Sequence, residues 1–87
     1  MSKQLIEMTT EEFFDSIAVD PSDVDERRLE ISKQRVLALK DGDKLDLAGG
    51  DVTVSNEAGV LFIEYNDINH REQVTAEMLA YIIAVDY

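Results

Sequence analysis

Apolar residues occupy every second position over much of the stretch from residue 43 to residue 65, and this alternation constrains the fold more than any other feature. It is typical of strands with one buried face, because successive side chains of a strand point to opposite sides of a sheet. The alternating pairs are Leu45 and Leu47, Val52 and Val54, and Leu61 and Ile63. Asp46 and Glu64 fall between apolar positions, so we expect them on the solvent-exposed face.

Two interruptions divide this stretch into three strands. Gly49 and Gly50 permit the positive φ angles that a tight hairpin needs, and residues 56–59 suit a connection of four or five residues. The pattern therefore predicts a three-stranded antiparallel meander.

The C-terminal segment follows a helical period instead. After a polar connector at residues 66–71, apolar side chains recur within an arc of about 100° on a helical wheel. They are Val74, Met78, Tyr81, Ile82 and Val85. We expect an amphipathic helix, capped by Asn69 or Thr75, that covers one side of the meander.

The N-terminal half predicts one or two further helices. Thr9 and Glu12 have the spacing of a capping box, and Phe13, Phe14 and Ile17 share the face that follows. This short helix is expected to end before residue 21, which is a proline.

A second helix is expected to start at Ser22 and to end near Gly42. Its apolar face would comprise Val24, Ile31, Ala38 and Leu39. Arg28 and Arg35 fall within the same arc, and Leu29 with Ile31 also fits a strand, so residues 23–40 form a helix or a helix plus a strand. The predicted fold class is α+β: a three-stranded antiparallel meander packed against a C-terminal amphipathic helix, with one or two N-terminal helices.

Length and composition exclude several kinds of chemistry. The 87 residues suit a single globular domain, 1–87, and the absence of cysteine removes disulfides, thiolate nucleophiles and zinc–sulfur sites. His70 is the one imidazole, and we interpret it as a solvated or helix-start residue of the polar connector. No nucleophile elbow, glycine-rich phosphate loop or calcium-loop pattern is present. We therefore predict a non-enzymatic protein without metal or cofactor.

Charge is distributed unevenly along the chain. Residues 1–26 hold eight acids and one base, residues 27–40 hold five bases and one acid, and residues 41–87 hold ten acids and two bases. Two explanations of the basic segment remain open: it is matched to acidic neighbours in the fold, or it pairs head-to-tail or in a dimer with another copy.

The acidity itself is the strongest indication of function. The chain has 19 acids against 8 bases, and a domain about 30 Å across is as long as a B-DNA segment with about 18 phosphates. If most acids face one way, the protein is a DNA mimic, an inhibitor or decoy that occupies a basic, nucleic-acid-binding type of site on a partner protein. The expected contact residues are Glu11, Glu12, Asp15, Asp41, Asp43, Asp46 and Asp51.

In size, acidity and α+β content the chain is similar to phage- and plasmid-borne inhibitors such as anti-restriction and anti-CRISPR proteins, and to toxin-immunity proteins. The likeness is one of type, with no shared motif. The alternative is a structural or assembly module that forms a small homo-oligomer through the helix at residues 78–85 or a sheet edge.

The sequence shows neither the apolar stretch of a signal peptide nor a run near the ~20 residues of a membrane span. We expect a soluble cytoplasmic protein. Its negative charge disfavours direct binding to nucleic acid or to anionic membranes.

Overall fold

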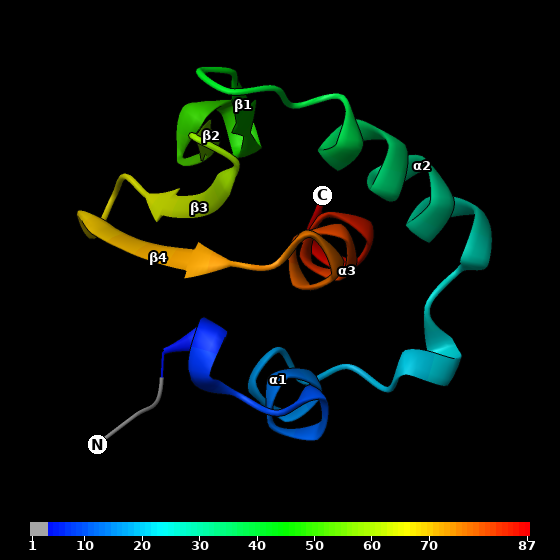
Figure 1. Cartoon of the computed structure of the whole chain (residues 1–87). Coiled ribbons are helices and arrows are strands. Elements are labelled where there is room, and N and C mark those ends of the chain that lie inside the picture. The colour runs from blue at the N-terminus through cyan, green and yellow to red at the C-terminus, as the bar shows by residue number, and fades with distance from the viewer. Residues whose placement is uncertain (1–3) are drawn as a thin grey trace.

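The computed structural model describes residues 4–87 and has an α+β architecture arranged around one central helix, α3 (Ala76–Asp86). Figure 1 shows α3 end-on, with the sheet on one side, α2 (Glu26–Leu37) on another and α1 (Thr10–Ser16) below. The buried residues of α3 are Leu79, Ala80, Ile82, Ile83 and Ala84. At about 100° per residue they span more than half of the helix circumference, so α3 has to be covered from several directions.

The sheet has four antiparallel strands whose spatial order follows the chain. They are β1 (Lys44–Leu47), β2 (Val52–Glu57), β3 (Val60–Tyr65) and β4 (His70–Val74). Val54 and Ile63 are cross-strand partners, and neither is exposed to solvent. The predicted alternation is confirmed. Asp46 and Glu64 alternate with the buried residues of their strands, so they lie on the face of the sheet away from the core.

The fourth strand corrects the prediction of a three-stranded meander. Val74 is a buried strand residue paired with Leu61, and the helix starts only at Ala76, with the side chain of Thr75 as its cap. The sequence pattern did not predict this strand because Glu72, a charged residue, occupies a core-facing position beside Ile63. Its carboxylate accepts the backbone N–H of Leu5 at 3.0 Å and lies 3.2 Å from His70 Nε2. A partnered carboxylate thus sits where the alternation calls for an apolar side chain.

The two predicted connections of the meander are interchanged. The Gly49–Gly50 region is part of a short 3₁₀ turn, η3 (Ala48–Gly50), and not a tight hairpin. The tight turn lies between β2 and β3, where Ala58 and Gly59 have φ angles of 55° and 85°. Two positive φ angles in succession match a type I′ turn, which suits the twist of a hairpin even though alanine is a poor residue for it.

Helix α1 forms as its sequence predicts. The Thr9 hydroxyl accepts the Glu12 N–H at 3.2 Å, and the Glu12 carboxylate accepts the Thr9 N–H at 3.0 Å, which completes the capping box. Phe13 is buried, and the ring of Phe14 meets that of Tyr81 edge-on at 4.9 Å. These two rings attach α1 to the core and to α3.

Helix α2 is a single helix, and it differs from its prediction in start and in orientation. Asp25 caps its first turn, while Ser22 belongs to a separate 3₁₀ turn, η2 (Pro21–Asp23). Its inward-facing residues are Leu29, Ser32 and Val36, and Leu39, just beyond the helix, also packs against the core. Ile31, which was expected in the core, is 55% exposed. This rotation keeps Arg35 in solvent, and the cost is an exposed isoleucine.

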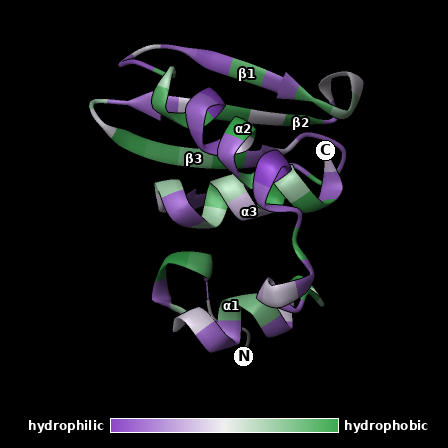
Figure 2. Ribbon diagram, turned by 90° about the vertical axis from the view of Figure 1, so that its right-hand side faces the viewer, coloured by the Kyte–Doolittle hydropathy of each residue, from purple (hydrophilic) through white to green (hydrophobic). Residues whose placement is uncertain are grey.

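Figure 2 shows the resulting layers, with the sheet above, α2 and α3 in the middle and α1 below. The molecule measures 35 × 32 × 24 Å, and its radius of gyration is 12.4 Å. Within residues 4–87, no helix has the length and apolarity to cross a membrane.

The β2–β3 turn generates a stability prediction. Replacing Ala58, which has a positive φ, with asparagine should raise the free energy of unfolding by about 0.5–1 kcal/mol, because asparagine tolerates the left-handed conformation better. Urea denaturation measures the change. A matched Ala38→Asn variant, at a position with right-handed helical angles, should show no gain, and an equal gain at both positions would contradict the explanation.

Candidate functional site

The chain leaves α1 through a turn that creates a concave surface. Ala18 has a φ of 54°, and its N–H donates to the Asp15 carbonyl at 3.2 Å. The Val19 N–H donates to the Phe14 carbonyl at 3.1 Å. This pair of hydrogen bonds is a Schellman motif with alanine in the position that glycine usually takes. The chain therefore reverses sharply after α1 and runs extended into η2.

Two adjoining hollows lie on either side of this turn, and we refer to them together as the α1–η2 groove. The first, of about 670 Å³, is lined by Thr10, Glu11, Phe14, Asp15, Ala18, Val19, Asp20 and Pro21. The second, of about 350 Å³, is lined by Ala18, Val19, Asp20, Asp23, Val24, Asp25, Arg28, Ala84 and Val85. Residues 18–20 line both, so the two hollows adjoin at this turn, between the end of α1, η2, the start of α2 and the end of α3.

The rim of the groove is strongly acidic. The carboxylates that line it are Glu11, Asp15, Asp20, Asp23 and Asp25, and the basic side chain among its lining residues is Arg28. Two of these acids are held in place by capping: Asp20 accepts the N–H and the hydroxyl of Ser22, at 3.0 and 2.8 Å, and Asp25 accepts the N–H of Arg27 at 2.8 Å. The rim thus combines fixed carboxylates with the freely exposed Glu11 and Asp15.

Hydrogen bonding keeps one rim carboxylate ionised in acid. The pKa of Asp20 is lowered from its ordinary value, first by the backbone N–H of Ser22 and then by the Ser22 hydroxyl, both of which donate to the charged form. Asp20 therefore stays ionised to a lower pH than an ordinary aspartate does.

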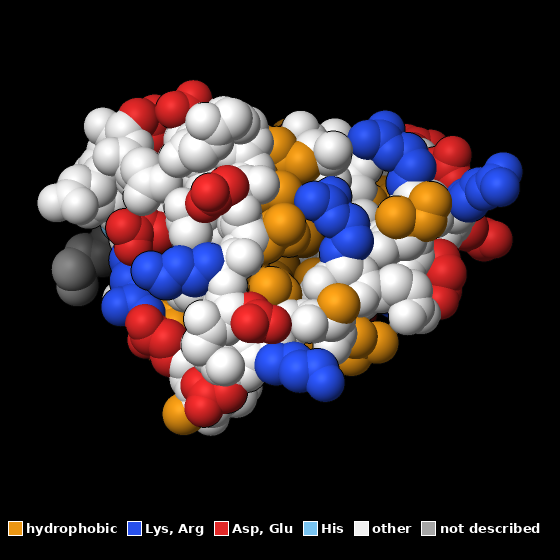
Figure 3. Space-filling model, turned by 90° about the horizontal axis from the view of Figure 1, so that it is seen from above, with side chains coloured by type: hydrophobic (Ala, Val, Ile, Leu, Met, Phe, Trp, Pro, Cys, Tyr) orange, Lys and Arg blue, Asp and Glu red, His pale blue; other side chains and the backbone are white. Residues whose placement is uncertain are grey.

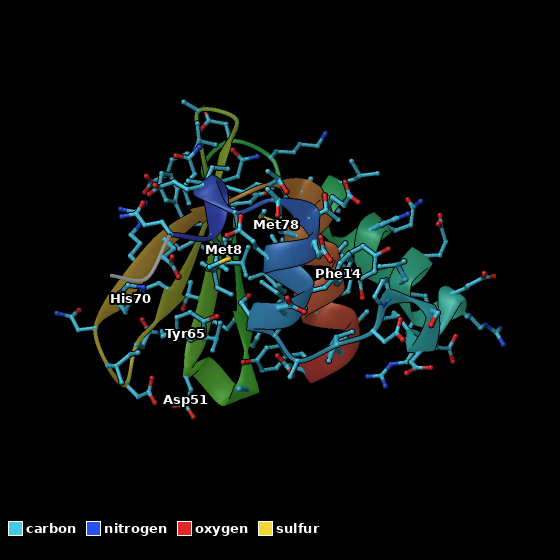
Figure 4. The ribbon with its side chains drawn as sticks, turned by 90° about the horizontal axis from the view of Figure 1, so that it is seen from below. Met8, Phe14, Asp51, Tyr65, His70 and Met78 are labelled. Atoms are coloured by element: carbon cyan, nitrogen blue, oxygen red, sulfur yellow. The ribbon has the colours of Figure 1, made fainter. Side chains whose placement is uncertain are left out.

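The floor between these acids is apolar. Phe14, Val19 and Pro21 line the first hollow, and Ala84 and Val85 of α3 line the second. Figure 4 shows the molecule from below, with Phe14 where α1 meets the C-terminal helix. An apolar floor inside a ring of acids suits an apolar side chain that is flanked by basic ones.

The structure brings together only some of the predicted contact acids. Glu11 and Asp15 line the groove, while the carboxylate of Glu12 on the same helix takes part in the capping box. Asp51 belongs to the connection between β1 and β2, and Figure 4 shows it at the end of the sheet, apart from α1.

The remaining three acids of the predicted set lie around β1. Asp41 accepts the Ala58 N–H at 2.7 Å, and Asp43 accepts the Lys40 N–H at 2.9 Å, so both serve the connection into β1. Asp46 lies on the open face of the sheet, where the Thr53 hydroxyl donates to it at 3.2 Å. The seven acids thus occupy several separate places.

Sequence reasoning missed Asp20, Asp23 and Asp25 as site residues. A signal was present, because apolar and acidic residues intermingle from Val19 to Asp25 in a segment with no basic residue. The sharp turn at Ala18 was not predictable from the sequence, because alanine rarely adopts the left-handed backbone conformation found there.

The open face of the sheet forms a second polar concavity, in which some of the polar groups are partnered. Arg71 lies 2.6 Å from the Glu57 carboxylate, and its guanidinium lies over the Phe62 ring at 4.1 Å from the centroid. The Asn66 amide donates to Thr53 at 3.0 Å. Because Arg71, Glu57 and Asn66 are already partnered, whereas the acids of the α1–η2 groove surround an apolar floor, the groove is the stronger candidate.

His70 lies in β4, not in a connector, and it stacks on Tyr65 beside Glu72. Across residues 4–87, no three His, Asp or Glu side chains are grouped so that they could hold a metal ion.

No protein-family model, curated protein or solved structure matches this chain.

The Asp20 cap generates a pH prediction. Because the folded-state pKa is lowered, this group stabilises the fold above its unfolded pKa, and the contribution is lost as the pH falls through the folded value. In Ser22→Ala, the pKa of Asp20 should rise part of the way to its ordinary value, since the backbone N–H of residue 22 still donates. Carboxyl-carbon NMR titration measures both midpoints, with Asp20→Asn assigning the resonance. Identical midpoints in the two proteins would show that the hydroxyl has no such effect.

Proposed function

We propose that this chain is a non-enzymatic protein-binding module whose α1–η2 groove holds a basic, apolar-tipped segment of a partner protein. The observation that carries the proposal is the apolar floor of the groove within a rim of acids, where a single basic side chain stands among the lining residues. Binding of this kind blocks the basic surface of the partner, so the module acts as an inhibitor or decoy of a nucleic-acid-binding type of site.

The groove favours a local contact over imitation of a duplex along one whole face. Asp41 and Asp43 stabilise the connection to β1, whereas Glu11 and Asp15 line the groove beside Phe14. Electrostatic attraction by the rim accelerates encounter and selects basic partners, while burial of an apolar side chain on the floor supplies affinity.

The alternative, an assembly module, would use the helix at residues 78–85 only in part. Leu79, Ala80, Ile82, Ile83 and Ala84 are buried in the core, whereas Met78, Tyr81 and Val85 are partly buried. Self-association through this helix is therefore limited to its partly buried residues.

Charge reversal at the rim tests the proposed function. We expect Glu11→Lys/Asp15→Lys to abolish capture of a basic protein from bacterial lysate, because the groove then repels its ligand. Wild type should retain that protein at about 50 mM salt and release it at about 500 mM.

The matched control is Asp46→Lys/Asp67→Lys, which makes the same change in net charge at exposed positions that do not line the groove. It should retain capture. Equal loss in both variants would show that net charge alone governs binding, and no salt-sensitive capture by wild type would refute the proposal for that lysate. Circular dichroism of each variant confirms that the fold is intact.

A further inference from the structure

The outer surface of α2 carries an exposed isoleucine between two arginines. Arg27, Ile31 and Arg35 follow one another at intervals of four residues, so they lie along one side of the helix over a rise of about 12 Å. Ile31 is 55% exposed, and both arginines are exposed. We call these three residues the α2 stripe.

The stripe has no partner within the described part of the chain. Ion pairs within residues 4–87 are formed by His70 with Glu72 and by Arg71 with Glu57, and none involves a base of residues 27–40. No side-chain hydrogen bond of Arg27 or Arg35 is formed there either. Within the described residues the basic segment thus forms no ion pair at contact distance, although Arg28 lines the same hollow as Asp20, Asp23 and Asp25.

Figure 3 shows the molecule from above. Over the part that contains α2, on the right, Lys and Arg side chains are interspersed with exposed hydrophobic ones and with Asp and Glu side chains. The chain outside residues 27–40 is strongly acidic, since residues 27–40 hold five bases and one acid while the whole chain has a net charge of -11. An exposed apolar side chain between two guanidiniums that form no ion pair within residues 4–87 thus contrasts with the acidity of the rest of the chain.

The α1–η2 groove has the complementary chemistry. Its apolar floor at Phe14 and Val19 suits an isoleucine, and its rim acids Glu11, Asp15 and Asp20 suit flanking arginines. Along α1, Glu11 and Asp15 are about 6 Å apart in rise, whereas the two arginines of the stripe are about 12 Å apart. One arginine therefore meets the acids of α1, and the other meets Asp20 farther along the rim.

We propose that the α2 stripe of one chain binds in the α1–η2 groove of a second copy, with Ile31 on the floor and the arginines against the rim. The proposal rests on the proposed function, because the same groove takes both ligands. The contact is heterologous, with different surfaces on the two copies, and it closes into a dimer if each copy binds the other. A basic partner then has to displace the neighbouring copy, so self-association regulates the free groove.

Complementation between two variants tests this arrangement. The stripe variant is Arg27→Glu/Arg35→Glu, and the groove variant is Glu11→Lys/Asp15→Lys. We expect wild type to self-associate in sedimentation-velocity runs at about 150 mM salt and at concentrations up to about 1 mM, and each variant alone to be monomeric. An equimolar mixture should form a heterodimer, because the groove variant still has its stripe and the stripe variant still has its groove.

Lys33→Glu/Lys40→Glu is the matched control, since it makes the same change in net charge on the basic segment outside the stripe. It should associate as wild type does. If the stripe variant does not fold by circular dichroism, Ile31→Ser serves in its place, with the apparent dissociation constant expected to rise at least tenfold.

Three outcomes would overturn the proposal: monomeric wild type over the whole concentration range, a control as monomeric as the stripe variant, or a mixture of the two variants that stays monomeric. The proposed function fails separately. A folded, monomeric stripe variant has a free groove and should capture the basic lysate protein at least as well as wild type, whether or not copies of the chain associate.

Discussion

The fold depends on the need to cover α3 on most of its circumference. A helix whose buried residues include Leu79, Ala80, Ile83 and Ala84 gains its stability only when other elements exclude water from several sides. The sheet, α2 and α1 each cover one side, and each is amphipathic because its other side meets solvent. The order of the layers follows from this single requirement.

A chain of 87 residues has few residues with which to cover α3, and both proposed interaction surfaces follow from that shortage. Where α1 ends, Ala84 and Val85 of α3 are left to line a hollow, and the polar segment that crosses it supplies acids. On α2 the residues that face the core are few, so Ile31 lies on the outer side among charges. Incomplete coverage of the core thus leaves apolar groups among acids in the α1–η2 groove and an isoleucine between arginines on α2.

Much of the fold was predictable from local rules, and the errors have identifiable causes. Alternation located β1 to β3 and their buried face, and the capping box located α1. The fourth strand was missed because Glu72 faces inward with its own hydrogen-bond partners, and the tight turn was missed because Ala58 takes a conformation that glycine favours. Glu11 and Asp15 were found by charge, but the floor they enclose arises from tertiary contacts between α1 and α3 that no local pattern encodes.

The N-terminal segment joins the rest of the structure by contacts that are distant in the chain. Neighbouring strands are connected by short turns and the sheet follows chain order, whereas the bond from Leu5 to Glu72 spans 67 residues. Closing long loops delays contacts of this kind during folding, and segments attached by few contacts open before the core unfolds. We therefore expect the amide of Val19, which donates to the Phe14 carbonyl, to exchange with solvent through local opening of α1. A partner that binds in the groove would then rigidify the α1 side of its floor more than the α3 side.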